Sequence, residues 1–213
     1  MPTIETARSW YSASDPVHGF DHVLRVYRMA ERLAIAEGAD LEIVRAAVLL
    51  HDINGAKLAS PDVQRADHHL DAAEFARRVL QEEGWPEERI SAVVHCIQAH
   101  RFRDQRVQPE TLEARVVFDA DKLDAIGAVG AARAISYAVS HGQPVYVPPS
   151  DQFMQTGETA HGEAHSAYHE HLFKLRKIKD RLYTPSGLAI ARQRHRFLET
   201  FFQELLAEYQ GER

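Results

Sequence analysis

The sequence lacks several features that mark whole classes of protein. Its 213 residues include one cysteine, Cys96, which excludes an intrachain disulfide and fits a reducing, cytoplasmic location. No run of about 18 apolar residues occurs, and no basic start precedes an apolar stretch, so we expect neither a membrane span nor a signal peptide. The 25 Lys and Arg against 31 Asp and Glu give a net charge of −6, which argues against a dedicated nucleic-acid-binding protein.

Two further patterns are missing. No segment sustains the alternation of apolar and polar residues that predicts a strand. The phosphate-binding pattern G-x-x-x-x-G-K-[ST] is also absent, so phosphate recognition would have to come from other groups. Apolar residues recur instead at helical spacing. We therefore predict an all-α protein, a single helical bundle domain over 1–213, with a core at about 15–140 and C-terminal helices at about 162–209.

Glycine, proline and capping residues set the expected helix ends. Gly38 ends the first long helix, Asp40 is the N-cap of the next, and Pro86 suits the first turn of another. The segment 141–160 reads as irregular, and the sequence leaves open whether it closes over a substrate. The predicted helices lie at about 2–12, within 14–38, and at 41–53, 67–83, 86–100, 111–140, 162–182 and 186–209.

Histidine is abundant, with 13 residues, and one of them stands in the stretch "LLHDING" at 49–55. His51 and Asp52 follow a helix that is apolar on every face. An uncompensated carboxylate there would cost on the order of several kcal/mol, which a cation would remove. A mixed His and carboxylate set suits manganese, iron, zinc, cobalt or nickel better than calcium. A hydrogen-bonded pair with a structural role is the alternative, and the pair alone does not decide between the two.

Helical phase sorts the other candidates. His100 follows the apolar stripe of 86–100, whereas His95 faces the opposite side. His69 lies on the stripe of 67–83, with Glu74 on its flank. The ordinary alternatives are a histidine favoured by the helix dipole for His100 and a hydrogen-bonded core residue for His69.

Helical phase is less decisive for the candidate residues of two other predicted helices. In 162–182, His171 lies beside the apolar stripe with Lys174 one turn later, while His161, His165 and His169 are expected on a solvated face. The stretch "DADKLDAIGA" offers three aspartates, Asp119, Asp121 and Asp124. Helical phase does not choose among these three, and a charged helix segment is most often a solvated face.

The order of these residues resembles a known family. His22, then His51 with Asp52, then a later aspartate follow the pattern of the HD superfamily of metal-dependent phosphohydrolases. "HVLRV" resembles its first-histidine helix, "AAVLLHDI" its second motif, and "DADKLDAIGAVGAAR" a segment of the YpgQ/YedJ-like group. "CIQAH", "HLFKLRKI" and "LYTPSGLAIARQRHRFLETFFQEL" also resemble that group. The resemblance spans about 15–209.

The resemblance implies which residues bind metal. It makes His22, His51, Asp52 and Asp121 the ligands, and it selects Asp121 over the two neighbouring aspartates. His100 and His171 match motif positions whose roles stay open. The chain departs from some HD nucleotidases, which have a catalytic glutamate three residues after the His-Asp pair, because Gly55 stands there.

The metal site predicts hydrolysis at phosphorus, and the resemblance to this group implies a nucleoside triphosphate pyrophosphohydrolase that releases pyrophosphate and a monophosphate. Manganese is the first candidate for the divalent ion, with iron, nickel, cobalt, zinc or magnesium as alternatives. Asp52 would orient the water, His100 would donate a proton, and Lys57 would offset phosphate charge, although Lys57 could be an ordinary loop lysine. The candidates for substrate contact are His69, Glu74, Arg101, His171 and Lys174.

The expected partner is a small phosphorylated molecule, a nucleotide. No membrane and no stable nucleic-acid partner is expected, and the oligomeric state stays open. Three other functions are compatible with the sequence. A two-metal phosphodiesterase or 5'-nucleotidase would bind a second ion, a nucleotide-binding sensor would bind ligand without turnover, and a structural helical protein would bind no metal.

Overall fold

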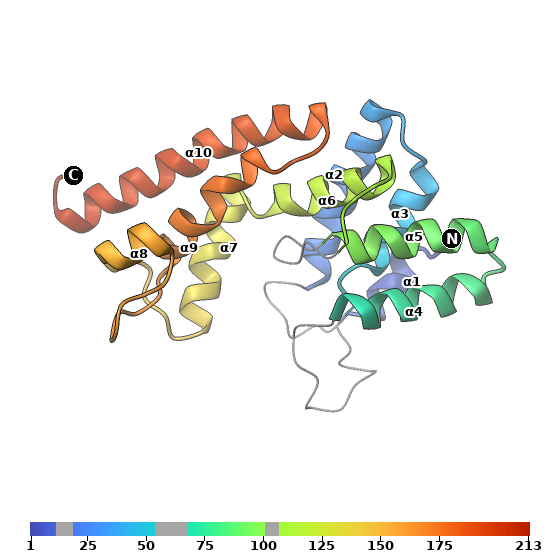
Figure 1. Cartoon of the computed structure of the whole chain (residues 1–213), viewed down its shortest axis with the longest axis horizontal. Coiled ribbons are helices and arrows are strands. Elements are labelled where there is room, and N and C mark those ends of the chain that lie inside the picture. The colour runs from blue at the N-terminus through green and yellow to red at the C-terminus, as the bar shows by residue number, and fades with distance from the viewer. Residues whose placement is uncertain (12–18, 54–67, 101–106) are drawn as a thin grey trace. The chain divides into compact units, whose positions relative to one another are not determined.

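The chain folds into helices. The structure, a computed structural model, describes residues 1–11, 19–53, 68–100 and 107–213, and these ranges contain no strand, which confirms the all-α prediction (Figure 1). None of the helices in these ranges is both long and apolar enough to cross a bilayer. The helices are α1 (Ile4–Arg8), α2 (Phe20–Glu37), α3 (Leu41–Leu50), α4 (His68–Glu82), α5 (Glu87–Ala99), α6 (Leu112–Asp124), α7 (Gly127–Ser140), α8 (Asp151–Thr156), α9 (Ala167–Phe173), the 3₁₀ helix η2 (Leu175–Asp180) and α10 (Pro185–Gln210).

The helices form two compact units. The N-terminal unit comprises Met1–Lys122 with Leu182–Gly187, and the C-terminal unit comprises Leu123–Arg181 with Leu188–Arg213. The division falls within α6 and again near the start of α10. The prediction of one domain over the whole chain stays a prediction.

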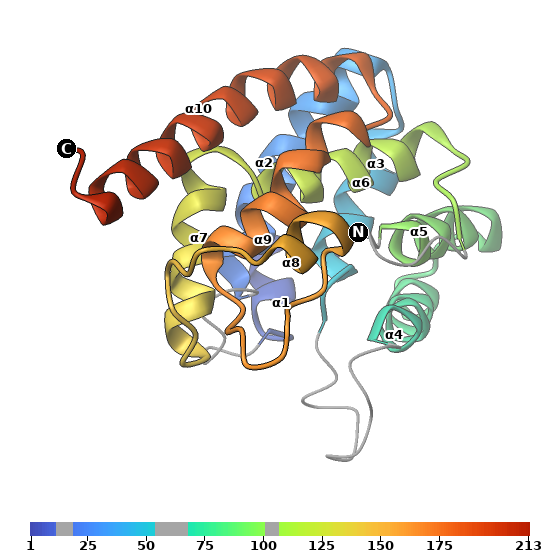
Figure 2. The ribbon, with the colours of Figure 1, turned by 60° about the vertical axis from the view of Figure 1, so that its left-hand side comes forward.

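The core of the N-terminal unit is built around α3. Helix α3 packs against α2, α4 and α5, and α4 lies beside α5, as Figures 1 and 2 show from two directions. Burial of a leucine side chain contributes roughly 1.5–3 kcal/mol, so α3 is firmly anchored by its apolar side chains. Its buried residues are Ile43, Val44, Ala46, Ala47, Val48, Leu49 and Leu50.

Local signals fix the ends of the helices around this core. Gly38 ends α2 in the left-handed conformation at φ 78°. The Asp40 side chain accepts hydrogen bonds from the backbone N–H groups of Glu42 and Ile43, which confirms it as the N-cap of α3. Pro86 precedes α5 as its N-cap instead of lying in its first turn.

The predicted helix over 111–140 is two helices. Helix α6 ends at Asp124, Ile126 is extended at φ −129° and ψ 166°, and α7 begins at Gly127 with φ 79°. The Arg194 guanidinium donates to the Leu123 carbonyl at 2.5 Å, and a Cβ at Gly127 would lie 3.0 Å from the Arg194 Cγ. A residue about 70 positions away in the sequence therefore lies against the break, which no local pattern announces.

The segment 141–166 of the C-terminal unit is organised around Glu163. Its carboxylate accepts from the Ser150 N–H at 2.7 Å, the Ser150 hydroxyl at 2.6 Å and the Ala160 N–H at 2.6 Å. The same segment contains α8. Because Glu163 belongs to this segment, the helix predicted over 162–182 begins later than expected. It consists of α9 followed by η2.

Both tryptophans lie in the N-terminal unit. Trp10 contacts Phe75 of α4 edge-to-face, with ring centroids 5.4 Å apart. The Arg89 guanidinium lies 5.4 Å from the ring centroid of Trp85. The sequence contains no third tryptophan, so the C-terminal unit has none.

Candidate metal centre

The first histidine of the site lies at the start of α2. The backbone N–H of His22 donates to the Gly19 carbonyl at 2.9 Å, so His22 lies in the first turn of the helix. Its side chain lies on the same buried face as Val23 and Val26 and is 2% exposed. The apolar stripe of α2 therefore turns this imidazole toward the interior.

The end of α3 orients the second histidine. His51 is the C-cap residue, and its ring Nδ1 donates to the Val48 carbonyl at 2.8 Å. This bond leaves the opposite ring nitrogen, Nε2, as the lone-pair nitrogen of a neutral imidazole. Nε2 is buried and has no hydrogen-bond partner among the residues that the structure describes. It lies 3.6 Å from Asp52 Oδ2 and 4.0 Å from Asp121 Oδ1.

Two carboxylates face these histidines. His22 Nε2 lies 3.5 Å from Asp52 Oδ2 and 3.3 Å from Asp121 Oδ1. Asp121 comes from the last turn of α6, and its second oxygen, Oδ2, accepts from the Lys122 ammonium at 2.5 Å. That ion pair leaves Oδ1 directed at the histidines. All of these residues belong to the N-terminal unit.

The pKa values of His51 and of the two aspartates in this cluster are shifted by burial and by neighbouring charges. Burial lowers the pKa of His51, which keeps the ring neutral. Burial alone would raise the pKa of Asp121, but the Lys122 charge together with His22 and His51 outweighs burial and lowers this pKa well below the usual range. The pKa of Asp52 is also lowered well below its usual range, since the neighbouring histidines outweigh its burial. The cluster thus combines the neutral imidazole of His51 with two ionised carboxylates.

This donor set fits a divalent cation. One ligand atom each from His22, His51 and Asp52 lie within 4.8 Å of one another. The Asp121 oxygen is 3.3 Å from the His22 nitrogen, a separation that two ligands of one ion can adopt. Two clustered carboxylates and a buried, unpaired imidazole nitrogen are costly without a positive charge between them. The cluster could therefore hold a metal ion.

His100 joins the same cluster from the end of α5. It is buried, as its helical phase predicts, and its Nδ1 donates to the Ile97 carbonyl at 2.5 Å. Its Nε2 lies 3.6 Å from Asp52 Oδ1, and its ring meets that of His51 edge-to-face at 5.2 Å. His95 is half-buried instead of solvated, because it accepts from the Glu110 N–H at 3.1 Å.

The other predicted site residues are not brought to this cluster by the described structure. Lys57 and Arg101 lie outside the described residues, and the side chain of His69, at the start of α4, is also outside them. Glu74 lies on an exposed face of α4. His171 and Lys174 belong to the C-terminal unit.

His171 has a polar environment of its own in that unit. Its ring is buried and stacks on Phe202 with centroids 4.2 Å apart, and its Nε2 lies 3.4 Å from Glu199 Oε1. Burial and the charges of Arg176 and His195 lower the pKa of His171 to about 4. Lys174 pairs with Glu170 at 2.8 Å.

Two residues of the site escaped sequence reasoning. Lys122 holds Asp121, and its position beside that aspartate in "DADKLD" was the available signal. Tyr11 donates its hydroxyl to the Leu49 carbonyl at 3.0 Å, one residue before the end of α3. Burial and the Asp52 charge raise the pKa of Tyr11 well above its usual value, so the hydroxyl stays protonated. No sequence pattern pointed to Tyr11.

Comparison with known proteins defines the class. The chain matches the family described as "HD domain" over residues 19–126, and it belongs to that family. This range contains every residue of the cluster described above. The predicted class, an HD-superfamily hydrolase, is confirmed and is consistent with a metal-dependent phosphohydrolase.

Individual relatives cover nearly the whole chain. The chain is 34% identical to the uncharacterised protein YpgQ of Bacillus subtilis over 97% of its own length and 94% of that protein. The crystal structure of B. subtilis YpgQ in complex with ADP has a TM-score of 0.71 at 30% identity and 97% coverage of both chains. A Lactobacillus plantarum protein has a TM-score of 0.76 at 28% identity, covering 99% of this chain and 100% of that one. An HD-superfamily hydrolase of Bacillus thuringiensis has a TM-score of 0.69 at 27% identity, with 97% and 96% covered.

Proposed function

We propose that this protein is a divalent-metal-dependent nucleoside triphosphate pyrophosphohydrolase, acting in the cytoplasm and releasing a monophosphate and pyrophosphate. The observation that carries the metal-dependent part is the buried His51 Nε2, which has no hydrogen-bond partner in the described structure and faces two ionised carboxylates. Hydrogen bonding within the described residues does not account for this arrangement, whereas a bound cation does.

His22, His51, Asp52 and Asp121 would hold the ion. Nitrogen and carboxylate ligands together suit manganese first, with iron, nickel, cobalt, zinc or magnesium as alternatives. When bound, the ion would supply positive charge to the phosphate oxygens and lower the pKa of a coordinated water. The remaining tasks of orientation and proton transfer fall to side chains of this chain.

Asp52 and His100 are placed to share these tasks. Asp52 Oδ2 faces the imidazoles of His22 and His51, whereas its other oxygen, Oδ1, faces His100 Nε2 at 3.6 Å. We assign to Asp52 the orientation of the attacking water and to His100 the transfer of a proton to the leaving group. Lys57 would offset phosphate charge. The proposed substrate contacts remain His69, Glu74, Arg101, His171 and Lys174.

The nucleotide substrate is supported by a relative. B. subtilis YpgQ, which resembles this chain along nearly its whole length, has been crystallised in complex with ADP. A bound nucleoside diphosphate is consistent with a site that accepts a chain of phosphates on a nucleoside. Cleavage that releases pyrophosphate is the finer part of the proposal, and product analysis has to distinguish it from release of phosphate.

One observation favours a second candidate. His100 adds a third imidazole to the cluster, next to the open side of Asp52, and a larger donor set is what a two-ion phosphodiesterase or nucleotidase needs. Metal stoichiometry separates the two candidates. A second ion that disappears in His100→Ala would favour the two-ion enzyme.

The test combines metal content with turnover. Wild type, Asp52→Ala, Asp121→Asn and Asp21→Asn are purified without a histidine tag, and bound metal is measured by mass spectrometry. Asp21 is exposed and adjacent to His22, so Asp21→Asn is a control for the same change of charge near the site. Nucleoside mono-, di- and triphosphates are then supplied with manganese, and pyrophosphate is separated from phosphate.

We expect wild type and Asp21→Asn to retain metal and release pyrophosphate. Asp52→Ala and Asp121→Asn should lose the metal and more than about 100-fold of the activity, because losing a ligand exceeds the 10–100-fold cost of losing a residue that only orients one. Metal without turnover of any nucleotide would indicate a sensor or another phosphate ester. Absence of bound metal from wild type, whether manganese or any of the alternative ions is supplied, would refute the proposal.

A further inference from the structure

Tyr11 connects the N-terminal segment to the helix that carries two of the proposed ligands. Its hydroxyl donates to the Leu49 carbonyl at 3.0 Å, across 38 positions of sequence. The last four carbonyls of an α-helix have no partner within the helix, and Leu49 is the penultimate residue of α3. Tyr11 therefore satisfies a carbonyl that the helix itself leaves open.

The carbonyl next to it is satisfied by the site. Val48 accepts from His51 Nδ1 at 2.8 Å. Two successive carbonyls in the last turn of α3 are thus held by side chains, one from His51 and one from Tyr11. These bonds fix the direction in which the backbone leaves the helix, and hence the directions of His51 and Asp52, which follow Leu49 by two and three residues.

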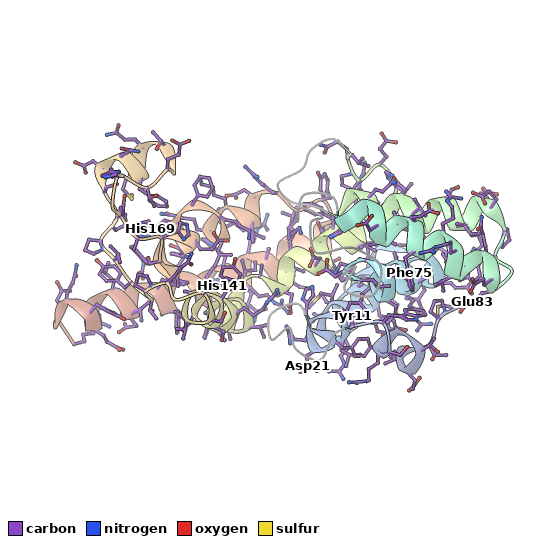
Figure 3. The ribbon with its side chains drawn as sticks, turned by 90° about the horizontal axis from the view of Figure 1, so that it is seen from below. Tyr11, Asp21, Phe75, Glu83, His141 and His169 are labelled. Carbon is purple, nitrogen blue, oxygen red and sulfur yellow. The ribbon has the colours of Figure 1, made fainter. Side chains whose placement is uncertain are left out.

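The segment that presents Tyr11 is itself anchored. Thr3 caps α1 by accepting from the Thr6 N–H, and Trp10 contacts Phe75 of α4. On the other side, the Tyr11 ring contacts Phe20 at the start of α2, with centroids 5.5 Å apart. Figure 3 labels Tyr11 and Phe75 within this same group of helices. The Tyr11 side chain therefore contacts both α2, which carries His22, and α3, whose C-cap is His51.

We propose that Tyr11 is a positioning residue for the metal site, where its hydroxyl fixes the last turn of α3 and so keeps His51 and Asp52 in register with His22 and Asp121. This inference rests on the proposed function, because it assumes that these four residues bind a metal ion. Tyr11 would not touch the ion or the substrate. It would act on the geometry of the ligands and hence on metal affinity.

The test compares Tyr11→Phe with Tyr183→Phe. Phenylalanine keeps the ring against Phe20 and removes one oxygen atom. Tyr183 also belongs to the N-terminal unit and loses a hydroxyl hydrogen bond, to the Gln108 side chain at 3.2 Å, so it is the matched control. Manganese affinity is measured by competition with a chromophoric chelator, and unfolding of the metal-free proteins is followed in parallel.

We expect Tyr11→Phe to bind manganese about tenfold more weakly, in the range seen when a residue that orients a ligand is removed. Tyr183→Phe should bind like wild type. Turnover by Tyr11→Phe should recover toward the wild-type rate as manganese is raised. Because bound metal also stabilises the fold, the unfolding of the metal-free proteins shows whether Tyr11→Phe remains folded at the assay temperature, in which case the recovery reports metal affinity.

The outcomes separate the two proposals. If wild type binds manganese and Tyr11→Phe binds it equally well, with only a lower unfolding temperature of the metal-free protein, Tyr11 is merely structural and this inference is overturned. If wild type binds neither manganese nor any of the alternative ions, the proposed function fails and this inference fails with it. A loss of affinity equal in Tyr11→Phe and Tyr183→Phe would also overturn the specific role of Tyr11.

Discussion

Three aspartates within six residues have three different environments. Asp119 is buried and accepts hydrogen bonds from the Thr184 N–H at 2.7 Å and the Thr184 hydroxyl at 2.6 Å. Asp121 faces His22 in the proposed metal centre. Asp124 pairs with the Arg133 guanidinium at 2.6 Å. The same residue type thus anchors a turn, offers a metal ligand and closes an ion pair.

Sequence reasoning could not assign these environments. Each depends on a partner that chain folding brings in, and the partners of Asp119 and Asp121 lie 65 and 99 positions away (184 − 119 and 121 − 22). Helical phase describes a residue's direction on its own helix and says nothing of what lies opposite. The family resemblance selected Asp121 because it carries information about other chains with the same fold.

His169 shows the same limit in a single residue. It was expected on a solvated face of its helix, but that expectation is wrong, because the ring is fully buried. Its Nδ1 lies 2.6 Å from the Ser166 hydroxyl and its Nε2 lies 2.9 Å from Glu163 Oε1. Hydrogen bonds at both ring nitrogens offset the cost of removing this imidazole from water. Their partners, Ser166 and Glu163, precede α9 in a segment whose course the sequence did not reveal.

Glu163 leads to a prediction about acid stability. Hydrogen bonds from Ser150, His169 and the Ala160 N–H lower the pKa of Glu163 to about 2, below its ordinary value of 4.5. A carboxyl with a depressed pKa in the folded state stabilises the fold above its unfolded pKa, and this contribution is lost as the pH falls through the folded value. Glu163→Gln should therefore be less stable than wild type at neutral pH. The gap should narrow between pH 4.5 and 2, as measured by denaturant unfolding across that range. A gap that is independent of pH would contradict the role of the charge.

At the scale of helices, some boundaries are set by local sequence signals and others by contacts with distant residues. Gly38 sets the end of α2 and Asp40 sets the start of α3, and each acts within one turn of its own position. The break between α6 and α7 was missed because Arg194 supports it from α10. Helix existence was therefore readable from the sequence, whereas a boundary set by tertiary contact was not.

The start of α10 has a close contact that makes a testable prediction. A Cβ at Gly187 would lie 2.5 Å from Asp119 Oδ2 and 2.7 Å from Thr184 Oγ1. Helix propensity alone would favour Gly187→Ala by roughly 1 kcal/mol. The steric clash should reverse that sign, because overpacking typically costs about 1–3 kcal/mol. We expect Gly187→Ala to lower the unfolding free energy measured in urea.

The neighbouring residue provides the control. The Ser186 hydroxyl is buried and has no hydrogen-bond partner in the described structure, while the Ser186 N–H donates to Glu37. Ser186→Ala removes an unpaired polar group and leaves the backbone bond intact, so it should be neutral or stabilising. Equal destabilisation by the two substitutions would show that the close approach of Gly187 to Asp119 is not what requires glycine.

At the scale of the whole molecule, all four proposed ligands lie in one of the two units. They come from α2, the end of α3 and α6, so a bound ion would join segments that are far apart in the sequence. The fold class and these four residues were predicted from the sequence, the first from hydrophobic periodicity and the second from family resemblance. The division of the chain into two compact units was not, because apolar spacing runs through both without a change in composition.

Metal binding should stabilise the fold by an amount that grows with the logarithm of the metal concentration. An ion that binds only the folded state adds RT ln(1 + [L]/Kd), about 2.7 kcal/mol at 100 times the Kd. Manganese should therefore raise the calorimetric unfolding temperature of wild type and Asp21→Asn, and a chelator should reverse the rise. Asp121→Asn should show no such rise. If the units unfold in separate transitions, manganese should move only that of the N-terminal unit, and an equal shift of both would indicate coupled unfolding.

The placement of the two tryptophans gives the protein a built-in optical reporter. Trp10 precedes Tyr11 and contacts Phe75, and Trp85 lies beside Arg89. Because both indoles belong to the N-terminal unit, selectively excited tryptophan fluorescence reports only on the unit that contains the proposed metal centre. Paramagnetic manganese bound there should quench this emission without any label, while tyrosine signals still report on both halves.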